Sequence, residues 1–297
     1  TKPVYDIKPF IGRELVSVKE TPVKVGILGY RTVPVNHPDK LALELCNDLL
    51  TNRASTGLLD KLRMDNKVMM AMTFPLSISD VGIQQVIFVP KLVGQSFEKA
   101  EALILAELNK LKSGEFDESL IEAAKINRIK EFDQKLEDPD NRGNIILQAF
   151  VYGKTWEETL QENENFSKLT KEDVMRVANK YFGSNYLAIF SKMGFPKKEK
   201  LAKPPYDAVV PKNTEAKSQF AQMLESKKDT FAAPRLIDFG KDVQFTDLSL
   251  NNHFYYTSNP INKLFNLTLK YGIGTYKYPV LDQATQYMDL IGTETKQ

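Results

Sequence analysis

The sequence predicts an α+β protein in which strands and helices occupy separate stretches of the chain. Two observations carry this prediction. Residues 22–194 show one strand pattern, two helices, a β-hairpin, a series of helices and a last strand pattern. After residue 234 the beginning of the same order recurs. Grouped strands and helices, rather than strict alternation, are typical of α+β domains.

The first half of this domain contains three predicted strands and two helices. Apolar and small residues alternate over Val23–Tyr30, which predicts a strand. A helix begins near Asp39, because apolar residues recur after it at helical spacing. A shorter helix is expected over Ser55–Arg63. The β-type runs Lys67–Pro75 and Gly82–Pro90 predict a hairpin, since six residues with turn-forming side chains separate them.

Capping residues delimit the helices of the next hundred residues. An apolar stripe from Phe97 to Leu111 ends at Gly114, a typical residue after a helix. Asp117 is expected to cap a helix that runs to about Leu136. Further helix starts are predicted at Asp138-Pro139, Thr155 and Thr170, the last of these helices ends at Gly183, and a strand follows at Asn185–Lys192.

Composition divides the chain into four segments. Residues 1–21 are interpreted as an irregular N-terminal arm and residues 22–194 as the α+β domain. Residues 195–233 are rich in Pro and Lys, which predicts a linker with a short helix at Glu215–Leu224. Residues 234–297 are interpreted as the truncated start of a second domain.

The second domain repeats the opening of the first. Strands are predicted at Phe254–Thr257 and Leu264–Gly272, and a helix from about Leu281 to Ile291. With one residue inserted, Tyr271-Gly272 aligns with Gly29-Tyr30 of the first domain, and the strand–turn–helix units correspond. The repeat stops after its first helix, and so small a unit seldom forms a stable core alone.

Composition excludes several functions. The chain has 297 residues and a net charge of +2, which leaves no excess of positive charge for nucleic acid. Its one cysteine, Cys46, allows no internal disulfide or thiolate metal cluster. Apolar runs are too short to span a membrane, and no targeting segment is seen. Because the chain begins at Thr1 without an initiator Met, we expect a piece of a longer protein, whose compartment cannot be read from it.

The histidines and the cysteine are weak candidates for chemistry. His37-Pro38-Asp39 matches the tripeptide of J-domain co-chaperones, but a turn that starts a helix is the better interpretation. Cys46 lies on an apolar helix stripe, which favours a small buried residue over a metal ligand. His253 is expected to be an exposed or edge histidine. Three further features are interpreted as structural: the glutamates at 157, 158, 162 and 164, the aromatic run Phe254–Tyr256, and the sequon at Asn266.

Three groups of residues together resemble a known family. Gly29–Pro34 followed by His37–Leu43 is similar to the opening of a second module in the pitrilysin/insulinase family of zinc metallopeptidases. Leu169–Val174 with Ala178–Phe182 resembles that module's closing helix. Asn259–Phe265, Tyr271-Gly272 and Leu290–Thr293 look like the start of the next module. The resemblance covers roughly residues 20–193 and 234–297, in the family's order.

The resemblance implies a fold and a place in a larger molecule. Members of the family are built from α+β modules, each with a largely antiparallel sheet and helices packed on one face. Two pairs of modules enclose a chamber for unfolded peptides, and zinc is held in the first module by H-x-x-E-H and a distal Glu. No H-x-x-E-H occurs in this chain, so we assign no catalytic, cofactor-binding or metal-binding residue here. Zinc is implied only for the module that this chain lacks.

The sequence therefore favours a non-catalytic segment of a zinc-dependent endopeptidase, which forms part of the chamber wall and is inactive alone. Whether the parent is an active enzyme is left open. Its expected partners are the remaining modules of its own polypeptide and the peptide substrates of the parent. Two alternatives stay open at this point. The chain could be a scaffold or binding subunit from a catalytically inactive homologue, or an unrelated α+β interaction domain.

Overall fold

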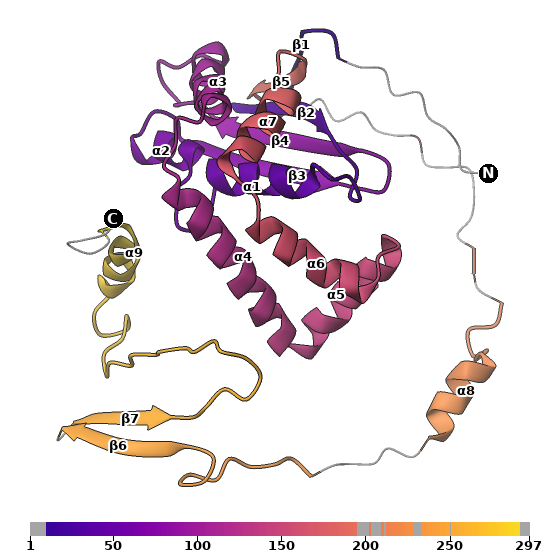
Figure 1. The fold of residues 1–297 in the computed structure, drawn as a ribbon, viewed down its shortest axis with the longest axis vertical. Coiled ribbons are helices and arrows are strands. Elements are labelled where there is room, and N and C mark those ends of the chain that lie inside the picture. The colour runs from indigo at the N-terminus through magenta and orange to yellow at the C-terminus, as the bar shows by residue number, and fades with distance from the viewer. Residues whose placement is uncertain are drawn as a thin grey trace. The chain divides into compact units, whose positions relative to one another are not determined.

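The computed structural model describes residues 10–194, 202, 209–210, 212–227, 233–249 and 251–291. The chain divides into two compact units, Thr1–Leu236 and Ile237–Gln297, which are described separately. The first unit contains a five-stranded sheet with helices (Figure 1). Its strands are β1 Arg13–Thr21, β2 Val25–Thr32, β3 Met70–Ser77, β4 Gly82–Val89 and β5 Tyr186–Met193. Its helices are α1 Lys40–Leu50, α2 Leu58–Met64, α3 Phe97–Ser113, α4 Ser119–Glu137, α5 Pro139–Val151, α6 Trp156–Ser167, α7 Lys171–Tyr181 and α8 Gln219–Ser226.

The sheet is mostly antiparallel, as the family resemblance implies. Its strand order is β1-β5-β2-β4-β3, and of its pairs only β1–β5 is parallel. The last strand of the unit, β5, therefore lies between β1 and β2, which come first in the sequence. The predicted hairpin is confirmed as β3–β4, paired from Met70–Val89 to Ser77–Gly82.

The core lies between one face of the sheet and the helices, chiefly α1, α3 and α7 (Figure 1). Alternate residues of the central strands point towards it: Leu28 and Tyr30 of β2 are fully buried, as are Val86 and Phe88 of β4. Aromatic rings fill the space between sheet and helices. Phe97 of α3, for example, stacks on Phe190 of β5 with ring centroids 4.5 Å apart.

Helix boundaries agree with the capping residues. Gly114 follows α3 with a left-handed φ of 77°, which glycine adopts without strain. Asp138 caps α5, and Thr155 and Thr170 form capping boxes at α6 and α7. Several boundaries differ by a few residues. The helix predicted at Ser55–Arg63 is α2, Leu58–Met64, and the N-cap of α4 is Glu118 and not Asp117. The helix predicted at Glu215–Leu224 is α8, Gln219–Ser226, and α7 ends at the C-cap Phe182, one residue before Gly183.

The interpretation of residues 1–21 as an irregular N-terminal arm is wrong for its second half. Residues 1–9 lie outside the described residues, but Arg13–Thr21 form β1 at the sheet edge. The strand is exposed along most of its length, so it has no buried face to produce a clear apolar alternation. What holds it is backbone pairing with β5, which no local pattern indicates. The proposed linker falls mostly outside the described residues; α8 lies within it.

The second unit contains two strands and a helix, but one of the strands lies elsewhere than predicted. Its elements are the hairpin β6 Gln244–Ser249 with β7 Asn252–Tyr256, and α9 Leu281–Ile291. The predicted helix is confirmed, and β7 corresponds to the first predicted strand. The strand predicted at Leu264–Gly272 is wrong, because these residues pair with no other described strand. The strand β6 was not predicted.

Candidate functional site

The face of the sheet opposite the helices carries an apolar surface, which we call the open sheet face. One side chain from each strand forms a row across it: Val16, Ile189, Ile27, Ile87 and Met72, in the order β1-β5-β2-β4-β3. Val16 and Met72 at the ends are 45% and 43% exposed, and the three isoleucines are partly exposed. No described helix packs on this row.

Neighbouring rows extend the apolar surface towards β3. Phe74 is 54% exposed and lies opposite Gln85. Leu76 and Ile83, which face each other across β3 and β4, are 43% and 37% exposed. Isolated exposed apolar residues are normal, but a contiguous patch of this kind marks an interaction surface. The open sheet face is therefore the candidate functional site of the first unit.

The alternation of β2 explains why the sequence produces two apolar faces. Leu28 and Tyr30 point into the core, while Ile27 points to the open side. An antiparallel sheet with one side in water normally has polar residues on that side. Here the three central strands carry Ile27, Ile87 and Ile189 on the open side, which favours a sheet that is covered there by another surface.

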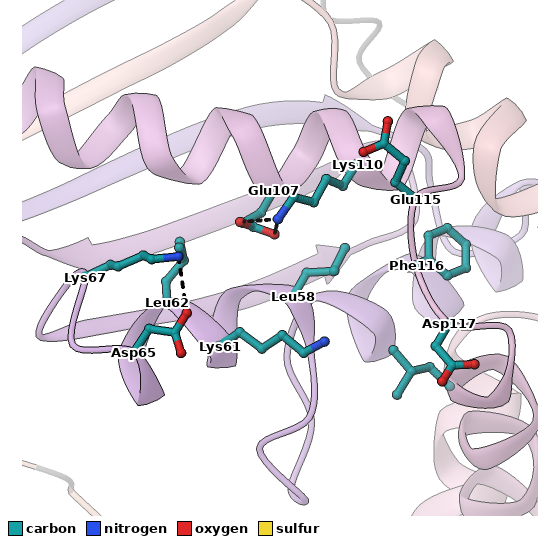
Figure 2. A pocket seen from close by; sticks show the side chains of 11 residues that line it. Leu58, Lys61, Leu62, Asp65, Lys67, Glu107, Lys110, Glu115, Phe116 and Asp117 are labelled. Atoms are coloured by element: carbon teal, nitrogen blue, oxygen red, sulfur yellow. Dashed lines mark hydrogen bonds and ion pairs between the residues drawn. The ribbon is translucent and has the colours of Figure 1, made fainter.

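A cleft of about 440 Å³ lies on the helix side, between α2, α3 and the loop before α4 (Figure 2). The buried Leu58 and Leu62 form part of its wall. The buried carboxylate of Glu107 accepts hydrogen bonds from Lys110 Nζ at 2.9 and 3.0 Å. At the far end, Lys67 pairs with Asp65 at 3.2 Å. Because charges of both signs line the cleft, its chemistry favours no particular ligand.

Two buried carboxylates hold elements of the fold together through ion pairs and hydrogen bonds. Asp39, before α1, accepts bonds from Arg176, Lys180 and Tyr181 of α7 at 2.7–2.8 Å. Burial alone would raise the pKa of Asp39, but these hydrogen bonds outweigh it and hold the pKa well below its usual range. The cluster fixes the start of α1 to the end of α7.

The second buried carboxylate, Glu101 of α3, anchors the edge strand. It receives two hydrogen bonds from the guanidinium of Arg13 in β1, both at 2.8 Å. It also accepts one from Tyr186 Oη at 2.9 Å. A bidentate Arg–carboxylate pair of this kind is geometrically specific. It holds β1 against the helix layer, although the strand itself is exposed.

The three residues considered from the sequence as candidates for chemistry do not form a common site. His37 Nδ1 accepts a hydrogen bond from the Asp39 backbone N–H at 3.0 Å, which is the expected turn before a helix. Cys46 is fully buried, and its Sγ donates to the carbonyl of Val174 at 3.7 Å. Burial raises the pKa of the Cys46 thiol, so it is an inert core residue. His253 is exposed, as predicted, but pairs with Asp247 across the hairpin at 2.5 Å.

The other features are also structural. Glu158 closes the Thr155 capping box, and Glu162 pairs with Lys154. The sequon residue Asn266 lies in an exposed segment without regular structure, where a strand was expected. Within the described ranges, no three His, Cys, Asp or Glu side chains are grouped to hold a metal ion. No helix among the described residues is long and apolar enough to cross a membrane.

Comparison with known proteins identifies the class. Residues 1–128 match the family model described as Peptidase M16 inactive domain. The chain is 30% identical over 158 residues to the zinc protease PqqE of Helicobacter pylori, a match that spans 52% of this chain and 35% of that protein. It thus corresponds to about a third of a longer relative.

Solved structures share the fold. A protease from Helicobacter pylori superposes with a TM-score of 0.55 at 22% identity, over 61% of this chain and 44% of that one. An inactive peptidase domain from Bordetella parapertussis gives 0.51 at 20% identity, over 64% and 98%. A peptidase M16 inactive domain from Pseudomonas fluorescens gives 0.52 at 12% identity, over 66% and 47%.

The first unit thus has the α+β fold of solved M16-like inactive domains. Residues 1–128 are similar to the inactive domains of the pitrilysin/insulinase (M16) family, and solved domains of that kind share the fold. The alternative of an unrelated α+β interaction domain is therefore set aside.

Proposed function

We propose that this chain forms part of the wall of a peptide-enclosing chamber in a zinc-dependent endopeptidase. The parent would hydrolyse peptide bonds with a zinc-activated water held in a module that this chain lacks. The chain itself would hold no cofactor and act through its surfaces. Its partners would be the remaining modules of its own polypeptide, and peptides would be substrates of the whole assembly. The proposed segments are a first module that includes β1 and runs to residue 194, a linker at 195–233 and a second module from 234.

The open sheet face is the observation that carries this proposal. A row of apolar side chains crosses all five strands and lies exposed or partly exposed. Such a surface costs free energy in water, roughly 25 cal/mol for each Å² of apolar area left uncovered. A neighbouring module of the same polypeptide would cover it. Helices α1, α3 and α7 cannot serve in this way, because their apolar residues already form the core.

A substitution that introduces a charge on the open sheet face tests the proposal. The chain would be co-expressed with the parent's H-x-x-E-H module, and co-purification and peptide hydrolysis would be measured. We expect Phe74→Lys to reduce both at least tenfold, because a lysine would be buried at the interface. Phe150→Lys is the matched control: Phe150 is 81% exposed, but on α5, away from the sheet face. Undiminished binding of the Phe74 variant would refute the role of this face.

The alternative of a scaffold subunit in a catalytically inactive homologue stays open. It predicts the same interface and the same loss of co-purification for Phe74→Lys. It differs in one readout, because no variant or wild-type assembly would hydrolyse peptides. The presence or absence of H-x-x-E-H in the parent's catalytic module, read from its sequence, decides between the two.

A further inference from the structure

Helices α4, α5 and α6 form an excursion from the first unit, which we call the helical excursion. Figure 1 shows α4 leading away from the sheet and α6 returning towards α7. Ile121 and Ala124, near the beginning of α4, and Phe166, at the end of α6, belong to the buried core. Ala149 of α5 is buried outside that core. The helical excursion thus joins the core at its two ends, and a part with so few buried contacts is expected to open locally.

Arg128 of α4 connects three helices between these two ends. Its Nη1 lies 3.3 Å from Oε2 of Glu44 in α1, and its Nε donates a hydrogen bond to Oδ1 of Asn163 in α6 at 3.4 Å. The guanidinium also lies over the ring of Phe166, 5.1 Å from its centroid. The other carboxylate oxygen of Glu44 pairs with Lys40 at 2.9 Å. Because Oε2 of Glu44 is buried and accepts no hydrogen bond within the described residues, it depends on the charge of Arg128.

Two other polar contacts attach the helical excursion, and both lie near water. Nη1 of Arg53 is 3.8 Å from Oε1 of Glu131 in α4, but the Arg53 side chain is 93% exposed, so this pair is weak. Nδ2 of Asn36 donates a hydrogen bond to the carbonyl of Tyr152, after α5, at 3.0 Å. Arg128 is therefore the main polar connection between α4 and the rest of the unit.

Asp48 lies one turn after Glu44 on α1 and is affected by charges on both α1 and α4. Burial has the largest effect and raises the pKa of Asp48 to about 6. Arg128 opposes this rise, as does a hydrogen bond with Asn47, whereas Glu44 and Glu131 raise the pKa further. Separation of α4 from α1 would let water reach the Asp48 carboxylate. Because hydration removes the cost of the charge, the ionised form favours separation of the two helices.

We propose that the helical excursion opens from α1 as a unit while the sheet stays folded, and that ionisation of Asp48 favours the open form. The closed form binds the Asp48 proton more tightly, so it is most favoured below about pH 4 and loses this advantage as the pH rises through about 6. The equilibrium constant for opening should therefore rise about tenfold between pH 5 and pH 7.5. This motion lies within the first unit and does not depend on the proposed chamber.

Amide hydrogen exchange of the full chain, resolved by peptide mass spectrometry, tests the opening. Exchange rates divided by the intrinsic rate at each pH give an opening constant for each segment. We expect a larger constant for α5 than for β2 and β4, with the tenfold rise at α5 between pH 5 and pH 7.5. Asp48→Asn should remove that rise. Equal constants for α5 and β2 would mean that α5 opens only by global unfolding, and a rise that persisted in Asp48→Asn would exclude Asp48 as its cause; either result would overturn the proposal.

Variants at Arg128 and in the core separate local opening from global unfolding. Arg128→Gln leaves Glu44 without its partner, and we expect the opening constant of α5 to rise on the order of tenfold. Lys130→Gln, which removes an exposed cation from α4, is the matched control and should have no such effect. Val86→Ala weakens the core and should raise the opening constant of β4 but not that of α5, because the core stays folded in the open form. An equal rise at α5 and β4 in Val86→Ala, or equal effects of Arg128→Gln and Lys130→Gln, would contradict the proposed opening.

Discussion

Asp39 and Asp48, at the start and within α1, have pKa values displaced in opposite directions. Asp39 is buried but receives three donors from α7, and its pKa falls. Asp48 lies towards α4, and its pKa rises to about 6, chiefly because burial disfavours the charged form. Nearby Glu44 and Glu131 raise the pKa further, and Arg128 opposes them. The contrast shows that donors, and not burial alone, decide which form is stable.

Asp48 makes the stability of the first unit depend on pH. Its folded pKa of about 6 lies above the ordinary value of 3.8, so the folded state binds the proton more tightly. The carboxyl therefore costs nothing below about pH 4, and its cost grows as pH rises to about 6. The full cost is at most about 3 kcal/mol. We expect Asp48→Asn to raise the free energy of unfolding at pH 7.5 and to leave it nearly unchanged at pH 4.

Urea unfolding at several pH values measures this effect. The variant should show a flatter dependence between pH 4 and 6 than the wild type. Glu157→Gln, which changes an exposed carboxylate on α6, serves as the control and should follow the wild type. Equal slopes for Asp48→Asn and the wild type would mean that Asp48 is solvated well enough to ionise normally.

At the scale of elements, α7 connects the core to the Asp39 cluster. Its inner side carries the buried Val174 and Val177, and its outer side supplies the donors to Asp39. The helix begins at a capping box, in which Thr170 Oγ1 accepts from the Asp173 N–H and the Asp173 carboxylate accepts from the Thr170 N–H. Fraying of this end would therefore reach both the core and the Asp39 cluster.

Removal of the Thr170 cap should be measurable in global stability. We expect Thr170→Ala to lower the free energy of unfolding by about 1 kcal/mol, the usual cost of losing such a cap. Thr170→Ser keeps the hydroxyl and should retain most of the stability. The midpoint of chemical denaturation reports both. A Ser variant as unstable as the Ala variant would show that the threonine methyl group, and not the cap, is important.

Local sequence signals predicted the helices well. The strands that were missed or wrongly predicted depend on pairing with distant residues, which no local signal shows. Capping boxes and Gly114 act within four residues, so the sequence shows them directly. The strand β1 depends on β5, which lies about 170 residues later and leaves no local trace. Leu264–Gly272 has the stronger pattern, but no described strand pairs with it. Alternation indicates that a segment can be a strand, whereas a partner decides whether it is.

At the scale of the whole chain, the first unit holds the buried core and the second has little buried surface of its own. Every fully buried large side chain of the described residues lies between Leu28 and Phe190. The second unit resembles the beginning of a domain, with a hairpin and a helix that are mostly exposed. The two units should therefore differ in their ability to fold alone.

Excised fragments test whether the first unit folds alone and whether its boundary lies at residue 22. We expect residues 10–194 to unfold in one cooperative transition, because the fragment retains all five strands and the core. Residues 22–194 should be less stable, because they lack β1 and the Arg13–Glu101 pair. The fluorescence of Trp156, the single tryptophan, and circular dichroism would follow both transitions. Equal midpoints would favour residue 22 as the true boundary.

The candidate site could not have been located from the sequence alone. The apolar row runs across the sheet, and its members come from residues 16, 27, 72, 87 and 189. They are so widely spaced that a window as short as a single helix or strand contains at most two of them. The family resemblance predicted the architecture and the absence of a zinc motif, whereas the exposed face follows from strand order and register. Both depend on contacts between residues far apart in the chain.

The position of β5 between β1 and β2 has a consequence for synthesis on the ribosome. The sheet cannot close until residues 186–193 have left the exit tunnel, because β5 separates the two strands that were made first. At roughly 5–20 residues per second, the roughly 150 residues between β2 and β5 take about 8–30 s to make. During that interval one edge of β2 has no strand partner, because β5 pairs with it there. Chaperone binding to nascent chains should therefore peak before β5 emerges and fall sharply afterwards.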